Sequence, residues 1–196
     1  MTLAHSSGER DAEIIPFPLE RVRRVESAQE PAGEESLSQE PASSPRQAAR
    51  ARRVSLHALG TRGLSRQELQ DRLVSRGIPE EHVEQEINHL SSRGFVDDQA
   101  LARELVDKYA LRGGLGRRAV AEKLRARDLS HDAILEALSL VDDEREEDNL
   151  RQAAKKRAAT WSSAPSAADI RRLGDFLMRR GFDPADVRRV ISDITN

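Results

Sequence analysis

Histidine is the first residue type to consider for chemistry, because its imidazole group binds metals and transfers protons near neutral pH. The two histidines closest in sequence, His82 and His89, are seven residues apart. On a helix, with a rise of ~1.5 Å per residue, they would lie about 10 Å apart, which is too far for one metal ion to bridge. The chain also has no Cys, so we predict that it has no metal site.

A glycine-rich run from Gly113 to Gly116, followed by Arg117 and Arg118, is a candidate phosphate-binding loop. Backbone amides at the start of a helix bind anions readily. The run lacks the GxxxxGK[ST] spacing of nucleotide-binding loops, however, and no strand pattern precedes it. The run therefore predicts a turn between two helices.

Asp97 and Asp98 are candidates for a pair of acids that transfer protons. A carboxylate at the start of a helix is the ordinary N-cap, however, and that role accounts for both residues. No other part of the sequence combines a nucleophile, a base and donors for an oxyanion. We therefore expect that the protein is not an enzyme and that it uses no cofactor.

Basic side chains are the stronger signal. Between Lys108 and Arg127 there are seven cations and one acid, Glu122. Such clusters indicate either a solvated helix surface or a surface that binds nucleic acid or an acidic protein. Few aromatic residues are available for base stacking, so we expect any DNA contact to be with phosphates. The candidate residues for binding a partner or the DNA backbone are Arg112, Arg117, Arg118, Lys123, Arg125, Arg127, Lys155, Lys156, Arg157, Arg171, Arg172, Arg179 and Arg180.

The elements that carry these cations are repeated. Residues 68–90, 119–141 and 172–194 align without a gap, at offsets of 51 and 53 residues. Their apolar residues follow the spacing of one helix face, so each copy predicts two helices joined by a tight turn. A third helical segment precedes each pair, at residues 49–62, 99–112 and 148–161. The six shared apolar positions are Leu69/Val120/Leu173, Leu73/Leu124/Leu177, Ile78/Leu129/Phe182, Val83/Ile134/Val187, Ile87/Leu138/Ile191 and Leu90/Val141/Ile194.

The turn inside each copy is marked by glycine in two of the three cases. Gly77 and Gly181 suit a left-handed backbone after a helix, whereas Asp128 stands at this position in the second copy. We expect slight strain at Asp128. An Arg precedes each turn, and a cation in the last turn of a helix is favoured by the helix macrodipole. These residues are Arg76, Arg127 and Arg180.

Composition indicates the fold class. Aromatic residues make up 3% of the chain and charged residues 34%, so the core must be aliphatic, which favours helices over sheets. We predict an all-α fold, an elongated curved array of three tandem three-helix modules at residues 46–96, 97–143 and 144–196. Residues 1–45 contain five of the eight Pro and a net charge of −5, and we predict that they form a disordered acidic tail.

Cellular location follows from what the sequence lacks. The N-terminus has no apolar signal-peptide core, and no stretch approaches the ~18 apolar residues of a membrane span. The absence of Cys is compatible with a reducing compartment. We expect a cytoplasmic monomer that does not bind membranes.

Two segments resemble a known family. The segment from Leu90 to Ala102, LSSRGFVDDQALA, is similar to a junction of the RecX family of regulatory proteins, and the segment from Gly116 to Ser130, GRRAVAEKLRARDLS, is similar to a second stretch of that family. The resemblance covers roughly residues 50–196. Two residues depart from the family pattern: Asp128 replaces the usual Gly, and Leu101 replaces the commoner Phe.

The resemblance implies a fold and a function. Members of this family look like tandem three-helix modules, and the likeness implies a protein that binds the RecA recombinase filament on single-stranded DNA along its helical groove. It further implies inhibition of the ATPase, strand-exchange and coprotease activities, with the DNA phosphate backbone contacted through the filament. Assigning the basic clusters to that surface is our own inference. The residues also leave open a freestanding DNA-binding protein that uses its paired helices as helix-turn-helix units.

Overall fold

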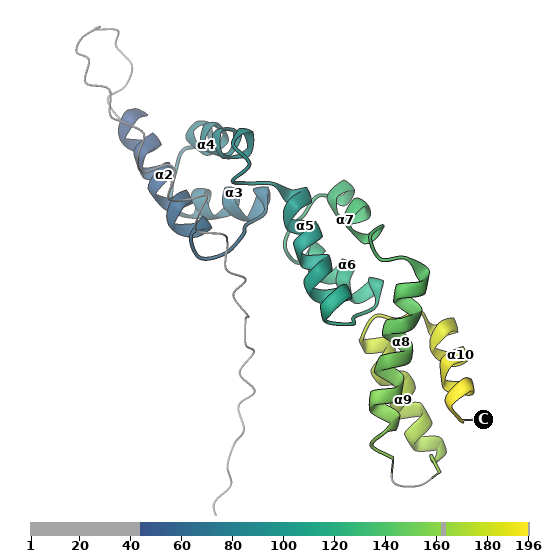
Figure 1. The fold of residues 1–196 in the computed structure, drawn as a ribbon. Helices are drawn as coiled ribbons and strands as arrows, with labels where there is room; N and C mark the ends of the chain where they lie inside the picture. Colours follow the sequence, from purple (N-terminus) through teal and green to yellow (C-terminus); the bar gives the residue numbers. More distant parts are fainter. Residues whose placement is uncertain (1–43, 162–163, 196) are drawn as a thin grey trace, which may run out of the picture.

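The structure, a computed structural model, describes residues 44–161 and 164–195, and all regular structure in these ranges is helical (Figure 1). The helices form three groups of three along an elongated row. The first module contains α2 (Ser44–Leu59), α3 (Arg66–Ser75) and α4 (Glu80–Ser92). The second contains α5 (Asp98–Val106) with its π-helical extension η1 (Asp107–Arg112), α6 (Arg117–Arg125) and α7 (His131–Leu138). The third contains α8 (Asp143–Ala158), α9 (Ala167–Arg179) and α10 (Pro184–Thr195).

Most of the predicted acidic tail lies outside the described residues. The exception is its C-terminal end, because α2 begins at Ser44, whereas we expected the tail to extend through residue 45. Helix α8 also begins earlier than expected, at Asp143 rather than at residue 148. The side chain of Asp142 accepts a hydrogen bond from the backbone N–H of Arg145, and this N-cap brings the acidic run into the helix.

Each module has its own apolar core. The predicted repeat positions supply these cores, and Leu73, Leu124 and Leu177 are each 0% exposed. Three separate clusters of buried side chains result, one for each module. Because no single core spans the row, contacts between neighbouring modules must fix their relative positions.

Side-chain caps mark the start of α3, α7 and α9. Ser65 and Glu68 form a capping box at the start of α3, in which each side chain accepts a hydrogen bond from the other residue's backbone N–H. Ser166 and Asp169 form the same arrangement at α9, and Ser130 caps α7. These caps satisfy N–H groups that the helices leave unpaired.

The turn after the middle helix is left-handed in all three modules, as the repeat predicts. The φ angles are +69° at Gly77 and +85° at Gly181, and Asp128 has a φ of +50°. Among the described residues, Asp128 is the one non-glycine residue with a positive φ. The strain expected from the sequence at this position therefore has a backbone cause.

Replacing Asp128 with Gly is expected to stabilise the protein by about 0.5–1 kcal/mol, because glycine adopts this conformation without a Cβ penalty. Urea unfolding followed by circular dichroism measures the change. Asp128→Ala keeps the strain and should give no gain. If both variants were equally stable, the left-handed backbone at this turn would carry no cost.

Candidate functional site: the module joints and a basic groove

The predicted cations fall into two groups. Four of them make hydrogen bonds or ion pairs that connect modules: Arg117, Arg118, Arg127 and Arg180. The others lie exposed on the helices. We call the contact between the first and second modules the first joint, and the contact between the second and third modules the second joint.

Arg127 holds the first joint. Its Nε atom donates to Glu68 at 2.7 Å, and its Nη2 atom donates to the same carboxylate at 2.9 Å and to the carbonyl oxygen of Gly63 at 2.6 Å. The side chains of Arg127 and Glu68 are only 18% and 13% exposed. This paired, largely buried geometry makes the contact stronger than a surface ion pair.

The ionisation of Glu68 reflects this contact. Burial raises the pKa of this carboxyl group, but the hydrogen bonds from Arg127 and from the backbone of Ser65, together with the charges of Arg127 and Arg62, lower it further than burial raises it. The net pKa lies below the ordinary value for Glu. The carboxylate is therefore charged when the first joint is closed near neutral pH.

The Asp97-Asp98 doublet caps two helices, one of them across the same joint. Asp97 caps its own helix, α5, by accepting from the N–H of Ala100 at 2.9 Å. Asp98 instead accepts from the backbone N–H of Arg66 at 2.8 Å, so it caps α3 in the preceding module. The expected N-cap role applies to both residues, but one of them acts across the joint.

The second joint repeats the arginine contact. Arg180 occupies the repeat position of Arg127, and its Nη2 atom donates to the carbonyl oxygens of Gly113 at 2.8 Å and Gly114 at 3.0 Å. Gly114 is in turn the repeat equivalent of Gly63, at the offset of 51 residues. In both joints, an Arg after the middle helix of one module thus binds the loop before the middle helix of the preceding module.

The backbones of two modules also meet directly at the second joint. The N–H of Gly116 donates to the carbonyl oxygen of Arg180 at 2.9 Å, and the N–H of Arg118 donates to that of Gly181 at 3.3 Å. A Cβ atom at Gly181 would lie 2.5 Å from the Cβ of Ala119 and closer still to its backbone nitrogen. Only glycine permits this approach.

Ion pairs surround this backbone contact. Arg117 donates from its Nη2 atom to the carbonyl oxygen of Val141 at 2.6 Å and pairs with Asp143 at 2.7 Å and Glu146 at 2.8 Å. Arg118 pairs with Asp183 at 2.6 Å. Part of the acidic run at residues 142–148 therefore lies against Arg117.

The π-helical turn η1 supplies further acceptors to α8. The side-chain amide of Asn149 donates to the carbonyl oxygen of Ala110 at 3.1 Å, and Arg145 donates to that of Leu111 at 2.9 Å. A π-turn widens the helix and often occurs at functional positions. Here η1 places carbonyl oxygens of the second module within hydrogen-bond distance of α8 in the third module.

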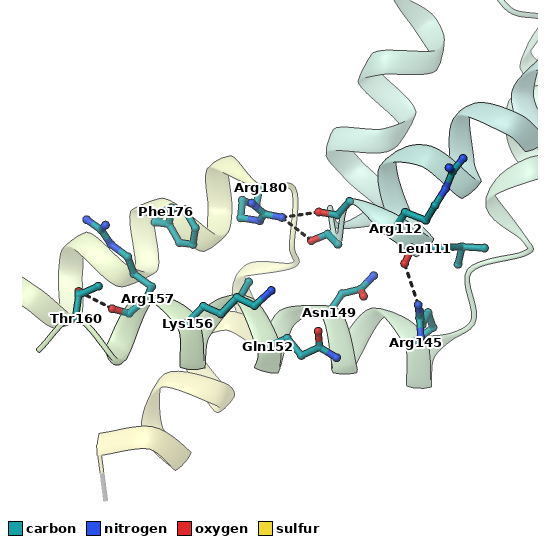
Figure 2. A pocket seen from close by; sticks show the side chains of 13 residues that line it. Leu111, Arg112, Arg145, Asn149, Gln152, Lys156, Arg157, Thr160, Phe176 and Arg180 are labelled. Atoms are coloured by element: carbon teal, nitrogen blue, oxygen red, sulfur yellow. Dashed lines mark hydrogen bonds between the residues drawn. The ribbon is translucent and has the colours of Figure 1, made fainter. Parts of the chain in front are cut away.

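A basic groove lies where these elements meet (Figure 2). It has a volume of about 480 Å³. Among its lining residues there are five cations and no carboxylate. The lining residues are Leu111, Arg112, Gly113, Gly114, Arg145, Asn149, Gln152, Ala153, Lys156, Arg157, Thr160, Phe176 and Arg180.

The remaining predicted cations are exposed, and most of them lie outside the groove. Lys123 lies over the ring of Tyr109, 5.0 Å from its centroid, and Arg172 pairs with Asp169 at 3.2 Å. Arg112 lines the groove and pairs with Asp107 at 2.7 Å. The last four are exposed and have no ion-pair partner within residues 44–161 and 164–195; they are Arg125, Lys155, Arg171 and Arg179. Of the predicted cations, the basic groove therefore gathers Arg112, Lys156, Arg157 and Arg180.

Sequence reasoning missed several residues of the joints and the groove. Glu68 lies in a helix of mixed charge, Glu146 is one of several acids in the run at residues 142–148, and Arg145 is surrounded by acids in the sequence. One feature of the sequence could have indicated the joints. Gly63 and Gly114 occupy equivalent repeat positions, and so do Arg127 and Arg180. Their contact becomes visible only when adjacent modules are placed side by side.

Family models match both ends of the row. The model described as the first three-helix domain of RecX matches residues 51–100, and the model described as the third matches residues 143–191. A protein named regulatory protein RecX, from Thermobifida fusca, is 33% identical over 145 residues, which are 74% of this chain and 78% of that protein. The chain belongs to the RecX family of regulatory proteins.

Other RecX proteins are also similar to this chain. The Streptomyces lividans RecX is 30% identical over 141 residues, covering 72% of this chain and 75% of that protein. The crystal structure of RecX from Lactobacillus salivarius matches with a TM-score of 0.69 at 19% identity, over 76% of this chain and 97% of that one. A second RecX crystal structure matches with a TM-score of 0.67. The predicted all-α array of three-helix modules is therefore confirmed as the RecX fold.

Within the described residues, no three His, Asp or Glu side chains come together to hold a metal ion, and no helix is both long and apolar enough to span a membrane. The residues of the basic groove donate hydrogen bonds and carry positive charge. Such a site can bind anions.

Proposed function

We propose that this RecX-family protein binds the RecA recombinase filament on single-stranded DNA and inhibits its ATPase, strand-exchange and coprotease activities. It acts as a regulator and carries out no reaction of its own. The observation that carries the proposal is membership in the RecX family, with matches to that family's first and third three-helix domains.

The architecture suits a filament partner. Three modules in an elongated row present a long surface rather than one compact site, and they can contact several protomers of a helical filament at once (Figure 1). The joints fix the spacing between modules through Arg127 and Arg180. A preorganised array loses less conformational entropy when it binds than a flexible string of modules would.

DNA-stimulated ATP hydrolysis by RecA tests the proposal. The purified protein should lower the rate of hydrolysis at concentrations stoichiometric with RecA, and it should slow strand exchange under the same conditions. An unchanged rate at a large molar excess would rule the proposal out.

The alternative of a freestanding helix-turn-helix protein is less well supported. In that motif the second helix of a pair enters the major groove with its N-terminal residues at the bases. Here the first turns of α4 and α7 carry Glu80, Glu81 and Asp132, which would meet the negative potential of DNA. Sequence-preferring DNA binding without RecA, measured over a salt titration, would favour this alternative.

The exposed cations of α6 are expected to contact the filament. Reversing Lys123 and Arg125 to Glu should raise the concentration needed for half-inhibition of RecA hydrolysis roughly tenfold, because two attractive charges become repulsive. Helicity at 222 nm should not change, since Glu is also a good helix former. Arg117 and Arg118 are unsuitable for this experiment because they hold the second joint.

A matched control distinguishes this surface from general electrostatics. Arg46 and Arg53 are exposed on α2 in the first module, and their reversal changes the net charge by the same amount. We expect this control to inhibit nearly as well as the wild type. Equal losses in both double variants would mean that the filament does not recognise α6 specifically.

A further inference from the structure

The basic groove at the second joint has an excess of positive charge that the fold does not neutralise. Its five cations are Arg112, Arg145, Lys156, Arg157 and Arg180, and it is lined by no acid. Within residues 44–161 and 164–195, Arg112 is the one cation of the five with a carboxylate partner, Asp107, and that pair is exposed to solvent.

The hydrogen bonds inside the groove leave its charge in place. Arg145 and Arg180 donate to backbone carbonyl oxygens, which are neutral acceptors. The Nε atom of Arg180 is buried and has no hydrogen-bond partner in the part of the chain that the structure describes. Lys156 and Arg157 are exposed on α8 and have no carboxylate partner within the described ranges. An anion in the groove would therefore meet the uncompensated charges of Lys156 and Arg157 beside that of Arg180.

The aromatic ring of Phe176 makes cation–π contacts with two of the cations. The guanidinium groups of Arg157 and Arg180 lie 5.7 Å from the centroid of its ring. Figure 2 shows the ring between these two side chains. Cation–π contacts of this kind restrict long side chains that would otherwise be flexible, so less entropy is lost when a ligand binds.

We propose that this groove binds the phosphodiester backbone of a nucleic-acid strand directly, through Lys156, Arg157 and Arg180. The role of the groove in the cell rests on the proposed function, because that function brings the protein to a DNA filament. Binding to the strand itself requires no recombinase. The contact is independent of base sequence, since no part of the proposed binding involves a base edge.

The lining favours phosphates over an acidic protein segment. Asn149, Gln152 and Thr160 add neutral polar groups beside the cations, and phosphate oxygens are commonly bound by such a combination. Protein interfaces usually depend on an apolar or aromatic anchor in a pocket. The one aromatic ring of this groove, Phe176, is already in contact with two guanidinium groups.

Fluorescence anisotropy with a labelled 20-nucleotide oligo(dT), without RecA, tests the proposal. Lys156→Glu combined with Arg157→Glu should weaken binding by at least tenfold at low salt. The slope of log K against log salt should decrease by about 1.4, because each lost phosphate contact on a single strand contributes ~0.7. Phe176→Leu, which keeps an apolar side chain, should weaken binding by about threefold through loss of the aromatic platform.

The control variant changes the same charge outside the groove. Lys155 and Arg171 are exposed on α8 and α9 but do not line the groove. Reversing both to Glu should leave oligonucleotide affinity within about threefold of wild type. Equal losses in the two double variants would overturn the proposal, and so would equally tight binding of labelled polyglutamate, which would indicate an acidic protein ligand.

RecA hydrolysis separates this inference from the proposed function. If the protein inhibits RecA but does not bind oligo(dT), the direct contact is wrong and the regulatory function stands. If the groove variants lose oligo(dT) binding as expected but the wild type has no effect on RecA, the groove stands and the regulatory function is wrong.

Discussion

Replacing Gly181 with Ala is expected to destabilise the protein by about 3 kcal/mol or more and to separate the third module from the second. Two costs combine at this residue. The φ of +85° penalises any Cβ by about 1–2 kcal/mol. The new methyl group would also overlap the backbone of Ala119, and such overpacking typically costs about 1–3 kcal/mol more.

Gly77 provides a matched control, because it occupies the same repeat position in the first module. Its φ of +69° carries a similar conformational penalty, but a Cβ there would meet nothing within 4 Å. Gly77→Ala should therefore cost only about 1–2 kcal/mol. The difference between the two variants isolates the contribution of the second joint.

Urea unfolding gives the stability of both variants, and small-angle X-ray scattering reports the shape of the row. Gly181→Ala should increase the radius of gyration at low urea, whereas Gly77→Ala should leave it unchanged. If the two substitutions had equal effects on stability and shape, the close approach of Gly181 to Ala119 would not hold the modules together.

The cores of the modules could be predicted from the sequence because they follow local rules. Apolar residues at helical spacing must face inward, and Leu69, Val120 and Leu173 occupy equivalent buried positions in their modules. The left-handed turn could be inferred in the same way, from glycine in two copies. The position of Asp128 then followed from the repeat, although its side chain gives no such signal.

The joints could not be predicted, because their residues look alike in sequence whether or not they have a partner. Arg76, Arg127 and Arg180 share one repeat position, and the macrodipole accounts for all three equally well. In the structure, the latter two bind the loop of the preceding module. Arg76 is exposed, and no described module precedes it. The same residue type is therefore structural in two modules and free to meet solvent in the first.

The groove could be predicted only in part. Lys156, Arg157 and Arg180 were candidates because they belong to basic clusters, but so were residues such as Arg171 that lie outside it. Arg145 was not a candidate, because acidic residues flank it in the sequence. Charge clustering along a chain shows that cations are abundant, whereas their convergence depends on the angle at which α8 and α9 meet η1.

Arg127→Met is expected to destabilise the protein by about 2 kcal/mol and to loosen the first joint. Methionine keeps much of the length of the side chain but removes the hydrogen bonds to Glu68 and Gly63. The carboxylate of Glu68 then loses its closest cation while it remains largely buried, which is the costly part of breaking such a pair.

Arg62→Met serves as its control, because Arg62 pairs with the same carboxylate at 3.1 Å from within the first module. Arg62 is 40% exposed, so its loss should cost less than about 1 kcal/mol. It should not change the distance between modules, measured by energy transfer between dyes on α2 and α7. Equal changes in that distance for both variants would contradict a specific role for Arg127.

The first joint should also open in acid. The folded protein holds the pKa of Glu68 below its unfolded value, about 4.5. The ion pair therefore contributes its full stability above that pH, and the contribution is lost as the pH falls through the lower pKa of the folded state. Glu68→Gln removes the titrating group and can still accept the capping hydrogen bond from Ser65. This variant should show a looser joint at neutral pH and little further opening in acid, whereas acid opening equal to that of the wild type would assign the transition to another carboxylate.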